Sequence, residues 1–455
     1  MHKTIFLLPL IVAGCALIPA YERPALPTPE QWPQPVVAPS GTTRAPDWRT
    51  FFSDPALIEL IEQALEHNRD LRIAVARVAE ARAQAGLAVA ERWPALEVGL
   101  QEQAARVPGG FNSAGRPAIN RRFDANLGIT AFELDFWGRV QSLDAAAQAN
   151  FLASEYARRA FRLSLISEVA SAWYGFIELS TRARLAEATV ASRLATRRLV
   201  ERRRDVGLAT DLDVLVADGA WQAAQAELAN LMRQRAAAEN ALRLLVGYAV
   251  AVPPAPSFGR LPEIEVGLPA EVLLNRPDVL AAEQKLLAAH ANIGAARAAF
   301  FPKIVLTALA GAASPALSGL FSGGSGAWSF VPALKWPLFD AGRAQANLDL
   351  AEARKHIAVA EYEKTLQQAF REVADLLAAR QYYAAQLVAL EAAEAAQAER
   401  LKRVEARHAA GVSSHLELLD AQREHFAAQQ SVVSARRALA ATAAALFKAM
   451  GGAGA

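Results

Sequence analysis

The chain has 455 residues, with 48 Lys and Arg against 46 Asp and Glu, so its formal net charge is close to zero. This balance, with no extended basic tract, argues against a nucleic-acid-binding protein. The single cysteine, Cys15, excludes an intrachain disulfide.

Residues 1–14 are typical of a lipoprotein signal peptide. Lys3 gives a positive start, and the apolar run that follows is too short to span a bilayer. Small residues directly before Cys15 resemble a bacterial lipobox, so we predict lipidation (palmitate or a similar acyl group) at Cys15 and a linker over 15–53. Ala16 departs from the aspartate that goes with inner-membrane retention. A chance cysteine in an ordinary signal peptide is the alternative.

The rest of the chain repeats itself once, at a spacing of about 204 to 208 residues. The recurring positions include Gly86 and Pro94 as Gly294 and Pro302, Leu134, Gly138 and Arg139 as Leu338, Gly342 and Arg343, and Gly207 as Gly411. This period is too long for a solenoid or propeller unit. We therefore expect two related repeats, 54–252 and 253–455.

Proline placement predicts one long helical tract in each repeat. None of the 23 prolines lies in 118–252 or 338–455, and proline breaks helix interiors. Each tract is interrupted once by glycine followed by Ser or Thr, at about 205–211 and 409–415, which reads as a helix stop and a new N-cap. Each tract should therefore be a helical hairpin with its tip at that point.

The proline-containing stretches alternate apolar and polar residues, which predicts strands. The expected strands cover about 95–106 and 122–134 in the first repeat, and about 303–313 and 327–337 in the second. Four strands cannot close a membrane barrel, because the smallest such barrels have about eight. Several chains would have to share one barrel; the alternative is a soluble α+β protein with a small sheet.

Several strings are specific enough to indicate a family. They are 48–57 (WRTFFSDPAL), 64–71, 76–83, 276–283 (RPDV…AE), 293–302 (IGAARAAFFP) and Tyr21-Glu22-Arg23-Pro24 after the lipobox. Together they resemble the TolC-like outer-membrane factors, in particular the lipoprotein branch of RND efflux components typified by OprM and NodT. The resemblance covers nearly the whole chain from Cys15 to about Gly452.

This resemblance implies a mainly α-helical fold with a membrane β-barrel part. Three copies would form a twelve-stranded barrel in the outer membrane of a Gram-negative bacterium and an α-helical tunnel in the periplasm. The protein would be the non-enzymatic exit duct of an efflux system, working with a periplasmic adaptor and an inner-membrane pump. The resemblance leaves the substrates, the pump and the open or closed state undetermined.

The family gate is a ring of carboxylates above the tips of the second hairpin, and the matching residues are Glu417 and Asp420. Residues three apart share a helix face, so six carboxylates in a trimer would raise one another's pKa and attract cations. The first repeat keeps only Asp213. A solvated helix face is the alternative for both residues. Where relatives carry latch residues, this chain has His408 and Ser413, so no latch of that kind is expected.

The resemblance also implies that the tips dock onto the adaptor, through Gly207 and Leu208 in the first repeat and Gly411 and Val412 in the second. The aromatic residues Trp328, Phe330 and Trp336 could form the aromatic belt of the barrel, or else pack a soluble sheet.

No catalytic, cofactor or metal site is expected, since the histidines are scattered and no HExxH, phosphate-binding or G-x-S-x-G motif is present. Two other functions remain open: the exit duct of a type I secretion system, and a non-conducting periplasmic scaffold or adaptor lipoprotein. Two hairpins, each with its own strand pair, favour the channel.

Overall fold

The computed structural model describes residues 17–33, 47–111, 115–247, 258 and 269–452. Cys15 and its signal peptide lie outside the described residues. The elements follow in the order α1 (Trp48–Phe51), α2 (Pro55–His67), α3 (Arg69–Ala90), β1 (Leu96–Val107), η1 (Gly109–Phe111), β2 (Ala118–Leu134), α4 (Arg139–Asp205), α5 (Asp211–Val246), α6 (Pro269–Leu274), α7 (Pro277–Ala298), β3 (Lys303–Ser314), η2 (Leu317–Gly319), β4 (Gly326–Lys335), α8 (Arg343–Ala409) and α9 (His415–Ala449). Within the described part of the chain, no helix is both long and apolar enough to cross a membrane.

The residues cluster into two compact units. The first combines Met1–Pro24, Val78–Ser154 and Ala281–Tyr362, and the second combines Ala25–Arg77, Glu155–Leu280 and Glu363–Ala455. The division falls inside α4 and α8, so each of these 67-residue helices contributes to both units.

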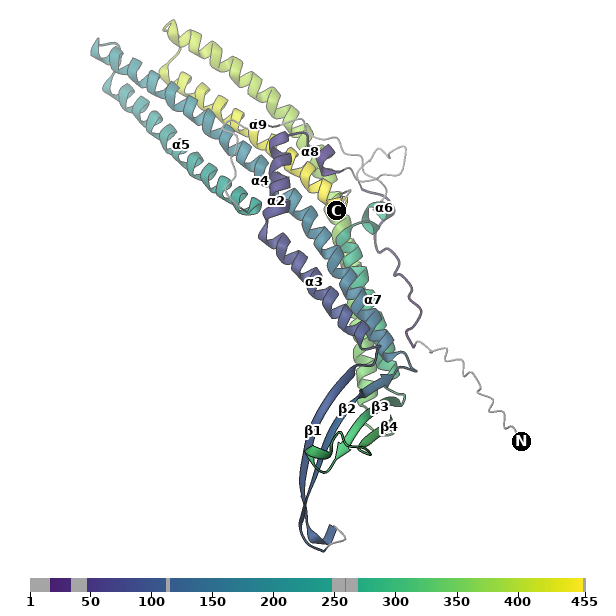
Figure 1. Cartoon of the computed structure of the whole chain (residues 1–455). Coiled ribbons are helices and arrows are strands. Elements are labelled where there is room, and N and C mark those ends of the chain that lie inside the picture. The colour runs from purple at the N-terminus through teal and green to yellow at the C-terminus, as the bar shows by residue number, and fades with distance from the viewer. Residues whose placement is uncertain (1–16, 34–46, 112–114, 248–257, 259–268, 453–455) are drawn as a thin grey trace. The chain divides into compact units, whose positions relative to one another are not determined.

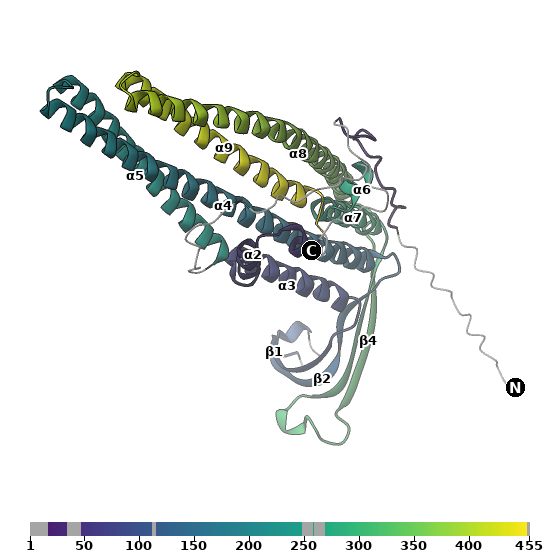
Figure 2. The same cartoon turned by 90° about the horizontal axis from the view of Figure 1, so that it is seen from above.

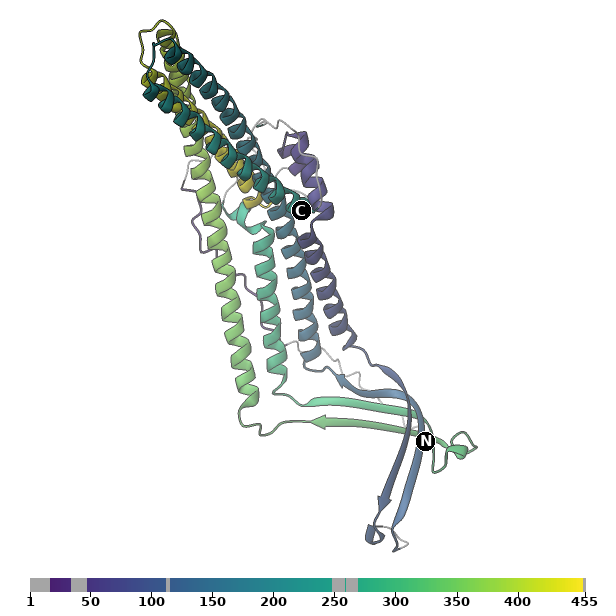
Figure 3. The same ribbon diagram turned by 90° about the vertical axis from the view of Figure 1, so that its left-hand side faces the viewer.

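The first unit holds one antiparallel sheet of four strands in the order β1-β2-β3-β4 (Figure 3). The central seam, β2 against β3, joins strands of the two sequence repeats. It contains a bulge, where Ala131 is an extra residue in the left-handed conformation with φ of 56°. Because β1 and β4 are the outer strands, each leaves one edge of backbone groups without a partner strand in this sheet.

One face of the sheet is apolar across all four strands. Directly paired residues share a face, and Val98 pairs with Leu127, Leu127 with Ala310, and Ala310 with Trp328. Val98 and Trp328 are 77% and 82% exposed in the single chain. The opposite face is more polar, as in the row formed by Gln101, Asp124 and Ala313. The sheet is therefore amphipathic, with its apolar face uncovered.

Helices of the first unit pack through small side chains. Ala146 and Ala149 of α4 form a buried cluster with Ala288 and Ala291 of α7. Ile18 of the N-terminal segment packs against this cluster, and a Cβ added at Gly294 would come within 2.6 Å of the Ile18 side chain. Close helix approach therefore depends on alanine and glycine at these positions.

The N-terminal segment is fixed to α7 by an ion pair. Arg23 donates two hydrogen bonds to Glu283, from Nε at 2.7 Å and from Nη2 at 2.8 Å. The Glu283 side chain is only 7% exposed, so the arginine neutralises a buried carboxylate. Burial and the neighbouring Glu283 raise the pKa of the Tyr21 hydroxyl, which donates to the same carboxylate, to about 12.

Two helical hairpins, α4–α5 and α8–α9, dominate the second unit (Figures 1 and 2). Ala183 and Ala186 of α4 share a buried cluster with Leu231 of α5, and Phe426 of α9 packs against it. Val404 of α8 packs on α9 in a further cluster. Helix α4 therefore contacts both α5 and α9, and α9 contacts both α4 and α8.

Arg276, the first residue of the RPDV string, joins the start of α7, the middle of α8 and the end of α9. Arg276 is 4% exposed; it donates to Asp278 at 2.8 Å, to Glu372 at 2.7 Å and to the Ala449 carbonyl at 2.8 Å. Burial alone would lower the pKa of Arg276, but the two carboxylates raise it above its usual value. The motif thus links α7, α8 and the end of α9.

Candidate functional site

Both hairpins turn through a glycine in the left-handed conformation. Gly207 and Gly411 each have φ of 76°, which costs a residue with a side chain about 1–2 kcal/mol. The Leu208 amide donates to the Arg203 carbonyl at 2.7 Å, and the Val412 amide donates to the Arg407 carbonyl at 2.9 Å. This closing pattern satisfies the last helix carbonyls, and it is the same in both repeats.

Apolar side chains at the turns are exposed. Val206 and Leu208 are 70% and 77% exposed at the first turn, and Val412 is 68% exposed at the second. Leu212 and Leu416, at the starts of the returning helices, are also exposed. The four residues predicted for docking, Gly207, Leu208, Gly411 and Val412, all lie at these turns.

The first hairpin restarts with a complete capping box. Thr210 Oγ1 accepts from the Asp213 amide at 3.2 Å, and Asp213 Oδ2 accepts from the Thr210 amide at 2.8 Å. The Thr210 amide and hydroxyl, by donating to it, lower the pKa of the Asp213 carboxyl. This is the only carboxylate that the first repeat keeps at a gate-equivalent position, and its hydrogen bonds assign it a capping role.

The second hairpin carries the two predicted gate residues, Glu417 and Asp420, in the first turns of α9. Asp420 accepts from Arg400 Nη2 at 2.7 Å and from Arg423 Nη2 at 2.6 Å. Glu417 lies 3.9 Å from Arg407. The sequence analysis did not predict these arginine partners. Arg423 was predictable, because it lies three residues after Asp420 on the same helix, whereas Arg400 belongs to α8.

The carboxylates keep access to solvent despite these contacts. The Glu417 and Asp420 side chains are 39% and 36% exposed. Ser414 caps α9 by accepting from the Glu417 amide at 3.1 Å, a single cap in place of the reciprocal capping box of the first hairpin. The second tip therefore carries the pair Glu417 and Asp420, of which the first repeat keeps only the counterpart Asp213.

Two histidines lie behind the second turn. His408 Nδ1 is 3.0 Å from the Ser413 carbonyl, and the ring of His415 lies 5.9 Å from that of His408. Both ring nitrogens of His415 are buried and have no hydrogen-bond partner among the described residues. Burial, followed by the nearby His408, lowers the pKa of His415. His408 and Ser413 are therefore buried residues that contact each other within the turn.

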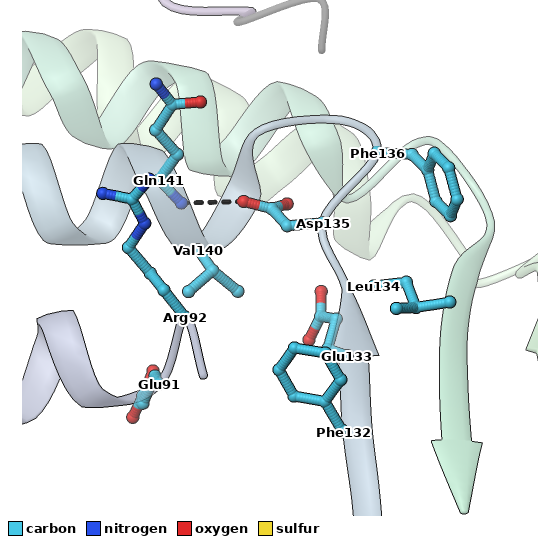
Figure 4. A pocket seen from close by; sticks show the side chains of 9 residues that line it. All are labelled: Glu91, Arg92, Phe132, Glu133, Leu134, Asp135, Phe136, Val140 and Gln141. Atoms are coloured by element: carbon cyan, nitrogen blue, oxygen red, sulfur yellow. Dashed lines mark hydrogen bonds between the residues drawn. The ribbon is translucent and has the colours of Figure 1, made fainter. Parts of the chain in front are cut away.

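A pocket of about 310 Å³ lies where β2 meets α4 (Figure 4). Three of its polar side chains have structural partners: Asp135 accepts from the Gln141 amide at 2.8 Å, Glu133 accepts from Arg139 at 2.6 Å, and Arg92 donates to Asp144 at 3.0 Å. These contacts stabilise the start of α4. No group of His, Cys, Asp or Glu residues suited to a metal ion is found among the described residues.

The predicted aromatic-belt residues lie in and just after β4. Trp328 and Phe330 belong to the uncovered apolar face and are 82% and 59% exposed. Trp336 follows the last residue of β4, Lys335, and its Nε1 donates to the Phe300 carbonyl at 3.2 Å.

The amphipathic sheet and the paired hairpins belong to a chain that the comparisons with known proteins assign to the transport channels of the outer membrane. The model of the outer membrane efflux protein family matches residues 60–248 and 268–452. The chain is 41% identical to the solvent efflux pump outer membrane protein SrpC of Pseudomonas putida, covering 97% of this chain and 96% of that protein. It is also 41% identical to the outer membrane protein OprJ of Pseudomonas aeruginosa, covering 98% and 94%.

The solved structures agree with this assignment. The open state of the MtrE outer membrane channel of Neisseria gonorrhoeae matches with a TM-score of 0.85 and 35% identity, covering 96% of this chain and 98% of that one. The chain belongs to the outer membrane efflux protein family. It is an outer-membrane exit duct of an efflux system in a Gram-negative bacterium and extends into the periplasm. The family comprises transport channels, not enzymes.

Proposed function

We propose that three copies of the chain form one duct, each giving four strands to a twelve-stranded barrel. The observation that carries this proposal is the amphipathic sheet with two open edges. In a bilayer every backbone group must be paired, so a four-stranded sheet needs further strands from other copies. The apolar row from Val98 to Trp328 would face lipid, and the row from Gln101 to Ala313 would face the lumen.

Trp328, Phe330 and Trp336 would supply part of the aromatic belt, since such rings favour the membrane interface. Cys15, in the proposed lipid-anchored form, would add an acyl chain to the barrel's own insertion. The two repeats, 54–252 and 253–455, would each contribute one strand pair and one hairpin.

The turns at Gly207, Leu208, Gly411 and Val412 would dock onto a periplasmic adaptor that is joined to an inner-membrane pump. Their support is the exposure of small apolar surfaces at both turns, with Leu208 77% and Val412 68% exposed. Exposed apolar patches mark interaction sites. The relative SrpC is named as the outer membrane protein of a solvent efflux pump; small molecules are the cargo class that we propose for this chain.

Glu417 and Asp420 would form the gate near the closed end of the tunnel. Support comes from their position in the first turns of α9 and from their partial exposure beside Arg400 and Arg423. In this arrangement the arginines compensate part of the acidic charge in each copy. Closure would then rest on a ring of ion pairs as well as on helix packing.

The test is single-channel current from the detergent-extracted protein in a planar bilayer. Small discrete steps are expected for the unmodified chain, and larger steps with weaker cation preference for Glu417→Ala with Asp420→Ala. Asp218→Ala is the matched control, because Asp218 pairs with Arg197 in the first hairpin at 3.1 Å. Unchanged conductance and ion preference in the double variant would remove both residues from the gate.

The barrel has a separate test. A Cys15→Ser variant should still require detergent for extraction, because strands rather than the acyl chain would hold it in the membrane. Release of that variant by salt or alkali alone would contradict the barrel.

A further inference from the structure

The turn that connects β2 to α4 is locked onto the segment that leads into β3. The Trp137 ring stacks on the Phe301 ring with centroids 4.7 Å apart and an interplanar angle of 22°. Trp137 Nε1 also donates to the Pro302 carbonyl at 2.8 Å. An ion pair between Lys303 and Glu133 at 2.7 Å reinforces the same joint. A turn from the first repeat is thus held by the second repeat.

The matching turn of the second repeat has no such receiver, meaning an aromatic residue before a strand on which the turn packs, within the described part of the chain. Leu338 and Phe339, between β4 and α8, are 83% and 90% exposed. The sequence places this turn in the same position of its repeat, since Leu134 and Gly138 recur as Leu338 and Gly342. Exposure of two adjacent large apolar side chains is costly in water, and such surfaces mark contacts.

The matching receiver in the first repeat, Trp93, is also exposed. Trp93 precedes β1 as Phe301 precedes β3, because Pro94 recurs as Pro302. The Trp93 side chain is 72% exposed. The described part of the chain therefore contains one complete joint, one exposed turn and one exposed receiver.

The sheet topology brings the two unfilled halves to the same end. Strands alternate in direction, and the end where Leu134 of β2 pairs with Ile304 of β3 is also the end where β1 begins and β4 finishes. If β4 of a second copy pairs antiparallel with β1, its turn after Lys335 arrives beside Trp93. This is the relation that β2 already has to β3 inside the chain.

We propose that Leu338 and Phe339 of one copy pack on Trp93 of the next copy and so complete a second joint of the Trp137–Phe301 kind. This inference rests on the proposed assembly of several copies and names the contact that fixes each boundary. The occupant is a second copy because the chain itself contains the same joint between its two repeats. One detail differs: Ala341 stands where Trp137 does, and Phe339 supplies the aromatic ring two residues earlier.

The test is disulfide cross-linking of the full-length chain in outer membranes, using Trp93→Cys together with Phe339→Cys. Mild oxidation should give covalent species up to the mass of three chains on a denaturing gel without reductant. Each single variant alone should give no such ladder, which also controls for Cys15. Within one chain, β1 and β4 are three strand spacings apart, roughly 14 Å, so the ladder reports contacts between copies.

The matched control pair is Trp93→Cys with Phe321→Cys. Phe321 is 82% exposed but lies in the loop between β3 and β4, at the other end of the sheet. This pair should remain uncross-linked. Equal cross-linking of both pairs, or none for Trp93→Cys with Phe339→Cys, would overturn the proposed joint.

The native mass of the same samples separates this inference from the proposed function. A three-chain mass without the ladder would refute the joint but leave the assembly intact, whereas a one-chain mass would refute the assembly itself. A second variant adds a non-covalent readout: Phe339→Ala should lower the temperature at which the oligomer dissociates, and Phe321→Ala should not. Equal dissociation temperatures for the two would contradict the joint.

Discussion

The two hairpin turns have the same backbone and different side-chain chemistry. Both bend through glycine at φ of 76°. The helix after the first turn starts with a Thr210–Asp213 capping box, whereas the helix after the second turn starts with a single cap from Ser414. His408 packs behind the second turn. The duplication has kept the geometry of the turn. Glu417 and Asp420 belong to no capping box; Asp420 pairs instead with Arg400 and Arg423, and the proposed gate uses both carboxylates.

The largest expected difference between the hairpins concerns charge compensation. Arg400→Gln with Arg423→Gln removes both cations that contact Asp420, so the negative potential at the constriction should grow and cation preference should rise several-fold. Reversal potentials in asymmetric salt measure this. Arg197→Gln, which removes the partner of Asp218 in the first hairpin, should leave the reversal potential unchanged; an equal shift would place both hairpins at the gate.

The caps provide the next comparison. Thr210→Ala removes one side of a reciprocal capping box and should destabilise the first turn of α5 by about 1–2 kcal/mol, against about 0.5–1 kcal/mol for Ser414→Ala at α9. Hydrogen exchange of the amides at 211–214 and 415–418 measures both. Equal acceleration in the two turns would show that the capping box adds nothing to a single cap.

Replacing the turn glycine with alanine should destabilise both turns by a similar amount. The Cβ added by Gly207→Ala or Gly411→Ala meets no atom within 4 Å, so only the left-handed backbone opposes each change, at about 1–2 kcal/mol. Gly219→Ala, inside α5 with the same open surroundings, should instead slow exchange in its helix. A clear inequality between Gly207→Ala and Gly411→Ala would mean that their surroundings differ in the assembled duct.

The smallest expected effect is a pH dependence confined to the second turn. Burial keeps the pKa of His415 below its unfolded value, and the facing groups are His408, Asp213, Arg193 and Arg203. The folded state therefore binds fewer protons than the unfolded one, so stability is present above about pH 6.5 and falls as the pH drops below it.

Exchange of the amides at 411–418, corrected for the intrinsic pH effect, should accelerate in this window. His415→Gln should remove the dependence, whereas His356→Gln, at an exposed position of α8, should preserve it. A dependence that survives in His415→Gln would assign the titration to another group.

Local patterns in the sequence predicted the elements but not how they pair. The absence of proline anticipated helices of the length of α4 and α8, because proline acts on its own helix. Strand β2 begins at Ala118, four residues before its expected start, because pairing with β1 extends the ladder through residues that do not alternate, such as Arg121 and Arg122. The extra residue at Ala131 likewise depends on β3.

The site residues likewise fall into those that the local sequence predicts and those that depend on how the helices pack. Glu417 and Asp420 could be named from their spacing after Gly411, and Arg423 could have been added because it lies three residues further on the same helix. Arg400 could not, since it is 20 residues away and meets Asp420 only because α8 and α9 pack together. The open turn at Phe339 also needed the structure, because its exposure has meaning only beside the filled joint at Trp137.

The seam between β2 and β3 also bears on the order of assembly. Since both strands belong to one chain, they meet at an effective concentration set by the connecting chain rather than by the amount of protein in the membrane. Half of the boundaries between repeats would then form in a unimolecular step, and only the remainder would depend on encounters between copies. Expression level should therefore govern the closing of the ring but not the folding of the sheet that each chain brings to it.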